Sequence, residues 1–325
     1  VPDSGCGSWL WESQSTNLIP YSELFNNSVW SKTRCTIDGG GHISPSGESN
    51  AFKMTATADD ARLQDGNSAA GVVYTQSIFV KSATGSDVSG QIDFVGVNIQ
   101  TFTATSKWQR VDTTLTNLTK AGVVRVRITN SGDELFIWGA QVEQQSYATS
   151  YIPTDGSSVT RNQDLCTNGG SLASINSTSG TLYFEGSALD WGASANNQIS
   201  LSDGSGSNRI MIYPYSENQL GLRFNANASQ LVSQTITVSI LSVNFKIAIR
   251  WGNGNYSIYQ NGLEAYTQSI SSTPLGLSKL NFSSVTGGSN FFGKTKALAV
   301  WKEALSDQEL ADLTYPTPTD PTFAL

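Results

Sequence analysis

Apolar and polar residues alternate in short runs through the first half of the chain. The runs cover residues 51–57, 72–81, 92–100, 108–115, 123–129 and 135–142. Alternation with a period of two places the apolar side chains on one face of a β-strand. Turn-forming sequences such as Asp38-Gly39-Gly40 and Asn130-Ser131-Gly132 separate the runs. Regular spacing of strands and turns predicts an antiparallel β-sandwich.

The strand pattern resumes in the second half after a connecting segment, residues 147–176, that has weak periodicity and many glycines and prolines. The expected strands are residues 180–189, 197–201, 209–213, 220–224, 231–238, 245–251, 256–259, 279–285 and 296–301. The dipeptides Asn253-Gly254 and Asn261-Gly262 tolerate positive φ and predict two tight hairpins. Most of the second half is therefore expected to form sheet.

One helix is expected near the end of the chain, at residues 306–313. Ser306 and Glu309 have the spacing of a capping box, and Leu310 and Leu313 can share a face. The proline-rich residues 315–321 cannot continue this helix. The sequence thus predicts an all-β protein of two tandem antiparallel β-sandwiches with one short C-terminal helix, divided into residues 1–165 and 166–325.

Charge and hydropathy limit the partners that this chain is expected to have. Charged residues make up 14% of the chain, with 19 Lys and Arg against 26 Asp and Glu and a net charge of -7. Nucleic-acid binding requires concentrated basic side chains, so a nucleic-acid partner is not expected. No apolar run approaches the ~18 residues of a membrane span, so membrane insertion is not expected either. The start Val1-Pro2-Asp3 lacks an initiator Met and a signal pattern, and this predicts a fragment or a processed product.

Residues able to ligate metal or act as nucleophiles are sparse. Cys6, Cys35 and Cys166 are far apart and show no zinc-site spacing. Three reduced thiols are favoured over one disulfide with one free thiol, and both alternatives remain open. His42 is the single histidine, lies in a Gly- and Ser-rich loop, and is interpreted as an ordinary loop residue. Mechanisms that need two histidines are excluded.

Two further sequence patterns that occur in catalytic sites lie in surroundings that do not support catalysis. Residues 288–295 fit the expression G-x-x-x-x-G-K-[ST], but no alternation of strands and helices surrounds them, so they are expected to form a loop between strands. Glu185 and Asp190 are the only close pair of acids on an expected strand of the second half, and their odd spacing puts them on opposite faces. No active site is supported, and the chain is not expected to be an enzyme.

Aromatic side chains remain as candidates for a binding site. Flat rings pack against the apolar faces of sugars, while amide side chains bind the hydroxyls. Eight Trp and eleven Tyr in a chain of low charge fit that requirement. The residues next to expected turns are the candidates for exposed, ligand-binding rings, namely Trp191, Tyr213, Tyr215 and Tyr256. Those within expected strands are assigned to the core, namely Trp108, Trp138, Trp251 and Trp301.

The second half resembles a laminin-G-like domain of the concanavalin A-like superfamily. The resemblance rests on residues 180–185 (G-T-L-Y-F-E), on 249–262 around the central hairpin, and on 292–310, which end in A-L-S-D-Q-E-L. Glycosidases of this superfamily carry E-x-D-x-x-E on an inner strand and related alginate lyases carry Q-I-H. Neither pattern occurs here, so the resemblance implies a binding or structural member. Calcium at the rim is common in such domains, but no acidic cluster matches a site.

The first half resembles the carbohydrate-binding-module jelly rolls found in tailed-phage virion proteins. The resemblance covers residues 5 to about 165 and is carried by W-G-A-Q-V-E at 138–143 followed by A-T-S-Y-I-P-T at 148–154. Many of these modules hold a structural calcium through an Asp on the last strand. Ala140 and Gln141 occupy that stretch here, so a calcium site is left open and no cofactor is expected to be required.

The two resemblances together imply a non-catalytic glycan-binding part of a phage tail fibre or another virion adsorption protein. Its expected partners are a polysaccharide or cell-surface glycan and other virion proteins, and its expected location is the virion or the extracellular space. Homo-oligomerisation in the parent protein would convert weak sites into avidity. One alternative is a purely structural virion or adhesin module, which burial of Tyr213 and Tyr215 would favour. Another is the accessory region of a polysaccharide-degrading enzyme.

Overall fold

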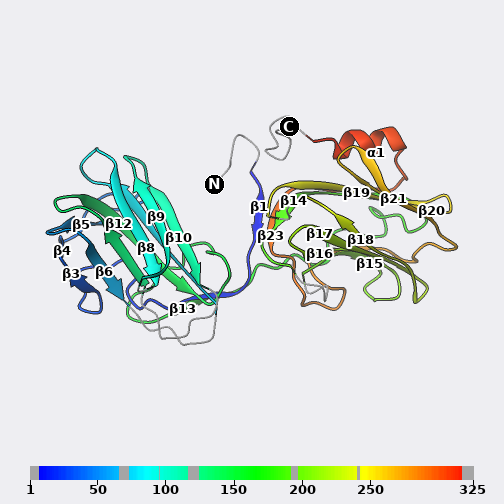
Figure 1. Cartoon of the computed structure of the whole chain (residues 1–325). Coiled ribbons are helices and arrows are strands. Elements are labelled where there is room, and N and C mark those ends of the chain that lie inside the picture. Colours follow the sequence, from blue (N-terminus) through cyan, green and yellow to red (C-terminus); the bar gives the residue numbers. More distant parts are fainter. Residues whose placement is uncertain are drawn as a thin grey trace. The chain divides into compact units, whose positions relative to one another are not determined.

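The computed structural model describes residues 7–65, 73–94, 96–115, 124–191, 197–239 and 242–316. It divides the chain into two units that are each built from antiparallel sheets around one core (Figure 1). The first sandwich consists of residues 14–162, and the second combines residues 7–13 with residues 163–316. The predicted all-β class with two sandwiches and a short C-terminal helix is confirmed.

The first sandwich contains two five-stranded sheets and one short ladder. The sheet that we call the β12 sheet has the order β10-β7-β12-β5-β4, the β11 sheet has the order β3-β6-β11-β8-β9, and β13 pairs with β2. The strands are β2 (Ser15–Asn17), β3 (Ser31–Thr33), β4 (Cys35–Ile37), β5 (Phe52–Ala56), β6 (Ala61–Asp65), β7 (Tyr74–Ser82), β8 (Val88–Phe94), β9 (Val97–Ala104), β10 (Gln109–Leu115), β11 (Val124–Ile128), β12 (Glu134–Glu143) and β13 (Val159–Arg161).

The alternating pattern explains how these two sheets enclose a core. Ile78 and Ile137 project inward from the β12 sheet and meet Ile92 and Val126 of the β11 sheet. Residues of opposite parity on the same strands face away from the core, because successive side chains of a strand point to opposite faces. The outer face of the β12 sheet is therefore built from a set of residues separate from the core.

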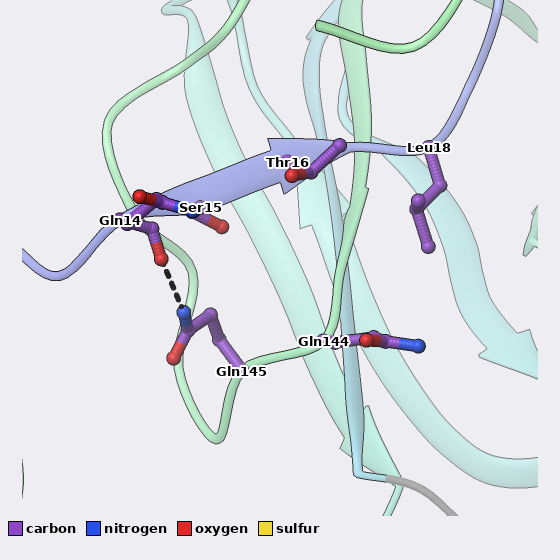
Figure 2. A pocket seen from close by; sticks show the side chains of 6 residues that line it. All are labelled: Gln14, Ser15, Thr16, Leu18, Gln144 and Gln145. Carbon is purple, nitrogen blue, oxygen red and sulfur yellow. Dashed lines mark hydrogen bonds between the residues drawn. The ribbon is translucent and has the colours of Figure 1, made fainter. Parts of the chain in front are cut away.

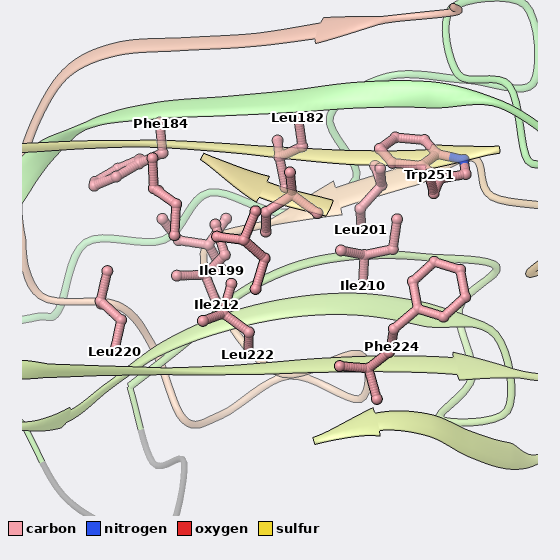
Figure 3. Close-up of a cluster of buried hydrophobic side chains, with 14 of the residues drawn as sticks. Leu182, Phe184, Ile199, Leu201, Ile210, Ile212, Leu220, Leu222, Phe224 and Trp251 are labelled. Atoms are coloured by element: carbon pink, nitrogen blue, oxygen red, sulfur yellow. The ribbon is translucent and has the colours of Figure 1, made fainter. Parts of the chain in front are cut away.

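The second sandwich also has two sheets, and a helix adjoins one of them. The β14 sheet has the order β1-β23-β14-β19-β20-β21, and the β16 sheet has the order β18-β17-β16-β15-β22. The elements are β1 (Trp9–Trp11), β14 (Gly180–Ala188), β15 (Ile199–Ser202), β16 (Arg209–Ser216), β17 (Gln219–Ala226), β18 (Ser229–Thr237), β19 (Phe245–Gly252), β20 (Asn255–Gln260), β21 (Leu263–Ser269), β22 (Lys279–Asn281), β23 (Gly293–Trp301) and α1 (Asp307–Thr314). Figure 3 shows the core between the sheets, where Phe184 and Trp251 face Ile212 and Leu222.

The helix α1 has the predicted start. Ser306 is its N-cap, and the side chains of Ser306 and Glu309 form the reciprocal capping box. Leu310 is fully buried and packs with Tyr183 and Tyr259 on the β14 sheet. Of the residues that match the P-loop expression, 288–292 precede β23 as the expected loop, whereas Gly293, Lys294 and Thr295 already lie on that strand.

The first strand of the chain lies in the second sandwich, which differs from the continuous boundary at residue 165 that the sequence suggested. Trp9–Trp11 pair with β23 in the register Trp9 to Thr295 and Trp11 to Gly293. The Trp11 indole N–H donates to Thr295 Oγ1 (3.1 Å), and its ring lies 4.9 Å from the ring of Phe282. Burial against these apolar partners holds the strand on the β14 sheet. The first sandwich is therefore an insertion between β1 and the rest of the second.

A second expectation is wrong in detail. Residues 92–100 do not form one strand, because the chain reverses between β8 and β9. Gly96 adopts φ 84°, and its N–H donates to Asp93 Oδ1 (2.5 Å), which stabilises the reversal.

The free thiols Cys35 and Cys166 form no disulfide, whereas Cys6 lies outside the described residues.

Asp60 is expected to make the stability of the first sandwich sensitive to acid. Hydrogen bonds from Arg62 and then Arg127 lower the pKa of its carboxyl from 3.8 to about 2. A carboxyl whose pKa is lowered on folding stabilises the protein above its unfolded pKa, and this contribution is lost as the pH falls toward 2. The shift corresponds to roughly 2 kcal/mol, which solvent screening reduces to about 1 kcal/mol.

The measurement is urea unfolding of wild type and Asp60→Asn at several pH values. We expect Asp60→Asn to lower the free energy of unfolding at pH 7, and the difference from wild type to shrink between pH 4 and pH 2. A difference that stays constant over that range would contradict this assignment.

Candidate functional site

The four aromatic residues singled out in the sequence occupy very different environments. Trp191 follows β14 and is exposed, with 39% of its surface accessible. Tyr256 is fully buried in the core, where its ring lies 4.9 Å from that of Phe224. Tyr213 is only 4% exposed, and its ring lies 6.3 Å from that of the half-buried Tyr215. Exposure was thus correctly expected for Trp191 and wrongly expected for Tyr213 and Tyr256.

Strand parity explains the error for Tyr256, and packing on the outer face explains it for Tyr213. Tyr256 alternates with outward-facing Ser257 and points into the core beside Ile258. Tyr213 lies on the outer face of the β16 sheet, but it packs with Met211 and Tyr215 and its ring covers Gly221. By the criterion set above, the burial of Tyr213 favours the purely structural alternative, whereas Tyr215 is only half-buried.

A larger group of rings lies on the outer face of the β12 sheet. We call Phe79, Phe136, Trp138 and Tyr151 the aromatic face. The Trp138 ring lies 5.3 Å from that of Phe79 and 4.6 Å from that of Tyr151. Phe136 precedes Trp138 by two residues on β12 and therefore points to the same side. Sequence reasoning assigned Trp138 to the core, and it is 6% exposed but lies outside the main cluster.

A bulge in β12 brings these rings together. The register of β12 against β7 shifts between Trp138 and Gln141, and Gly139 within the shift has φ 64°. A Cβ atom at Gly139 would lie 3.3 Å from the rings of both Phe79 and Tyr151. Bulges turn a side chain away from its regular direction, and glycine permits the close approach. The ring cluster thus depends on a backbone feature that only glycine accommodates without strain.

Cations border the aromatic face. The Arg110 guanidinium lies 5.5 Å from the centroid of the Phe79 ring, and the Lys81 ammonium lies 5.9 Å from that of Phe136. His42 also packs on Phe136, at 4.5 Å between ring centroids. Burial raises the pKa of Tyr151, whose protonated hydroxyl donates to Glu23 Oε1 (3.0 Å). Ring faces and hydrogen-bonding groups therefore lie next to one another on this side of the sheet.

Two carboxyls lie on the same side of this sheet, and each has a hydrogen-bonding side-chain partner. Glu134 accepts a hydrogen bond from Lys53 (3.0 Å), which lowers the pKa of Glu134. Asp38 Oδ2 lies 2.5 Å from His42 Nε2. Burial alone would raise the pKa of Asp38, but hydrogen bonds from the Lys53 N–H and from His42 outweigh that effect and lower it.

One polar atom of the aromatic face has no partner within the described residues. The Trp138 indole N–H is buried and makes no hydrogen bond there. Buried donors are nearly always satisfied, and an exception calls for an explanation such as a bound water or ligand. The rings of this face are thus accompanied by a free hydrogen-bond donor.

A polar hollow of about 260 Å³ lies at one end of the same sheet, lined by Gln14, Ser15, Thr16, Leu18, Gln144 and Gln145 (Figure 2). The Gln145 amide donates to the Gln14 carbonyl oxygen (2.9 Å). Thr75, on the outer face of β7, donates to the Gln145 carbonyl oxygen (2.8 Å). Thr75 precedes Phe79 by four residues, which is about 13 Å along a strand. Hydroxyl and amide groups thus extend the outer face beyond the rings.

The sequence motif that residues 138–143 and 148–154 make up together has a structural explanation. Gln141 is fully buried and its Oε1 accepts the Ile152 N–H (2.6 Å). Glu143, also fully buried, accepts hydrogen bonds from the Ser15 hydroxyl (2.6 Å) and the Thr149 N–H (3.0 Å). These two side chains fix the segment that carries Tyr151. The motif therefore positions one ring of the aromatic face.

Two searches of the described residues bear on metal and membrane binding. No group of three or more His, Cys, Asp or Glu side chains that could hold a metal ion occurs in this part of the chain. None of the helices described there has the length and apolar character that crossing a membrane requires.

No protein-family model matches the chain, and no curated protein is similar to it at a significant level. Several solved structures are similar in fold. A CBM40 of a Ruminococcus gnavus sialidase bound to α2,3-sialyllactose is 16% identical over 43% of this chain and 84% of its own, with a TM-score of 0.36. A CBM22 tandem of Paenibacillus barcinonensis Xyn10C is 9% identical over 92% and 99%, with a TM-score of 0.30. A Limulus polyphemus pentraxin is 15% identical over 48% and 77%, with a TM-score of 0.37. Likenesses this distant assign no family and no ligand to the chain.

Proposed function

We propose that this chain is a non-catalytic glycan-binding protein and that the aromatic face of the first sandwich is its site. The observation that carries the proposal is the contiguous group of Phe79, Trp138 and Tyr151 on the outer side of a sheet. Rings that form a platform next to amides, hydroxyls and charged groups suit pyranose sugars, which have apolar faces and polar edges.

The charges near this face support binding without catalysis. Glycoside hydrolysis needs one carboxyl that keeps its proton near neutral pH, which requires a raised pKa. The pKa values of Asp38 and Glu134 are both lowered. Both groups are therefore ionised at neutral pH and suited to accept hydrogen bonds from sugar hydroxyls.

The proposal extends to the setting of the protein. Its resemblance to phage virion modules suggests adsorption to a cell-surface glycan, in a virion or an extracellular protein that also contacts other virion proteins. A single face of this kind binds weakly, and several copies in a homo-oligomer would raise the avidity. Binding is proposed to need no metal, so it should persist in EDTA.

The test is affinity electrophoresis of the chain through gels that contain bacterial or algal polysaccharides. We expect one neutral polysaccharide to retard the wild type. Phe136→Ala and Phe79→Ala should each weaken that binding about tenfold, because each removes a ring contact worth about 1 kcal/mol together with buried area.

Trp191→Ala is the matched control, since it removes an exposed ring of the second sandwich. A loss of binding confined to Trp191→Ala would transfer the site to that sandwich. No retardation of the wild type by any polysaccharide would instead favour the purely structural alternative.

A further inference from the structure

The outer face of the β16 sheet in the second sandwich carries positive charges that have no ion-pair partner among the described residues. Ile210 and Leu222 point into the core, so Arg209 and Arg223 point outward from β16 and β17. Arg209 pairs with Asn225 and Met211 pairs with Arg223, which makes the two arginines diagonal neighbours about 7 Å apart at Cβ. We call Arg209, Arg223 and Lys279 the cationic face.

Lys279 joins this face from the edge of the sheet. It pairs with Ser202 of β15, and Ser202 pairs with Arg209 on its other side. Neighbouring strands lie about 4.8 Å apart, which places Lys279 about 10 Å from Arg209 in the same row. The three cations thus form a triangle on one surface.

No carboxylate neutralises these cations within the described residues. Elsewhere, Arg62, Arg125 and Arg250 each contact an aspartate. Arg209 and Arg223 have no ion pair with any described residue, and the Nε atoms of both are buried without a hydrogen bond. Burial and then the neighbouring Arg223 lower the pKa of Arg209, which reflects this unfavourable arrangement. Two like charges side by side repel each other.

The packing beneath the arginines holds one of them in place. The Arg223 guanidinium lies 5.3 Å from the centroid of the Tyr213 ring. That ring lies directly over Gly221, where a Cβ atom would come within 2.1 Å of it. A guanidinium stacked on a ring is preorganised and keeps its N–H groups free for a planar anion. This assigns the buried Tyr213 a supporting role rather than a direct contact with ligand.

We propose that the cationic face binds the acidic groups, carboxylate or sulfate, of an anionic polysaccharide. The inference rests on the proposed glycan-binding function and adds a second site, on the other sandwich, with its own ligand chemistry. Guanidinium groups bind carboxylate and sulfate oxygens through paired hydrogen bonds. An acidic polysaccharide presents such groups repeatedly and would neutralise both arginines, while its hydroxyls can reach Tyr215 and Asn225 at the border of the face.

The experiment measures binding of the whole chain to alginate, dextran sulfate and uncharged dextran by isothermal titration calorimetry. We expect alginate or dextran sulfate to bind more tightly than dextran, and added salt to weaken that binding. Alginate and dextran sulfate separate a carboxylate site from a sulfate site. The double variant Arg209→Gln/Arg223→Gln should lose at least tenfold in affinity, while Arg223→Lys should lose less.

The matched control is Lys294→Gln/Lys302→Gln, which removes two exposed cations from the same sandwich. Its affinity for the acidic polysaccharide should stay within twofold of wild type. An equal loss in both double variants, or no preference of the wild type for an acidic polysaccharide, would overturn the cationic site. Circular dichroism and thermal unfolding establish that each variant is folded.

The proposals for the two sites can be refuted independently of each other. Phe79→Ala and Phe136→Ala should leave acidic-polysaccharide binding intact, because their rings belong to the first sandwich. Loss of neutral-glycan binding in these variants with acidic binding retained supports both proposals. Acidic binding without any neutral-glycan binding would retain the cationic face and reject the aromatic face.

Discussion

Asp93→Ala is expected to destabilise the first sandwich by about 3–5 kcal/mol, the range for breaking a buried ion pair. Asp93 is fully buried on β8, and Arg125 on β11 is only 6% exposed. The Arg125 Nε lies 2.9 Å from Asp93 Oδ1 and 3.1 Å from Oδ2. Removing the carboxylate would leave the guanidinium buried without its counter-charge. Asp93 Oδ1 also accepts a hydrogen bond from the Gly96 N–H at the β8–β9 reversal.

Urea unfolding with peptide-resolved hydrogen exchange measures this effect and assigns it to residues 14–162. The control removes both charges, in Asp93→Leu/Arg125→Met. We expect it to recover much of the lost stability, because apolar residues of similar volume can replace a buried pair. A loss below about 1 kcal/mol in Asp93→Ala would mean that water reaches the arginine and that the pair is not a buried one.

Asn17→Ala is expected to cost about 3 kcal/mol, because four hydrogen bonds of roughly 1 kcal/mol each are lost and water replaces only some of them. Asn17 is fully buried. Its amide donates to the carbonyl oxygens of Ala140 (3.1 Å) and Ile152 (2.8 Å), and its Oδ1 accepts the N–H groups of Ile19 and Val142. One side chain thus joins the start of the sandwich to β12 and to the segment that carries Tyr151.

Loosening that segment should also affect binding. If the aromatic face is the glycan site, Asn17→Ala should weaken neutral-glycan binding without touching the ligand. Thr16→Ala is the matched control, since it loses one exposed contact to the Thr160 hydroxyl (2.8 Å) and should change stability by less than about 0.5 kcal/mol. Equal unfolding midpoints for Asn17→Ala and wild type would refute the role assigned to Asn17.

The sequence allowed the strands to be predicted, but not the aromatic face. In L-F-I-W at residues 135–138, Leu135 and Ile137 alternate with Phe136 and Trp138. Trp138 was assigned to the core because it lies within an expected strand. The bulge at Gly139, which gathers the rings, leaves no signal in the hydrophobic period.

The cationic face was missed for a different reason. Arg209 and Arg223 lie in different strands, and their proximity depends on the register of β16 against β17. That register shifts between Pro214 and Ser216, so strand boundaries alone do not fix which residues meet. The absence of carboxylates around them is a property of the folded surface that composition cannot reveal.

The discontinuous second sandwich has a consequence for synthesis of the chain. Trp11 and its partner Thr295 are 284 residues apart. At about 5–20 residues per second, Trp9–Trp11 remain without β23 for roughly 15 to 60 seconds during translation. Residues 14–162 contain their own core and can fold within that interval. The inserted sandwich therefore lengthens the time for which two tryptophans and a leucine stay available to chaperones or to neighbouring nascent chains.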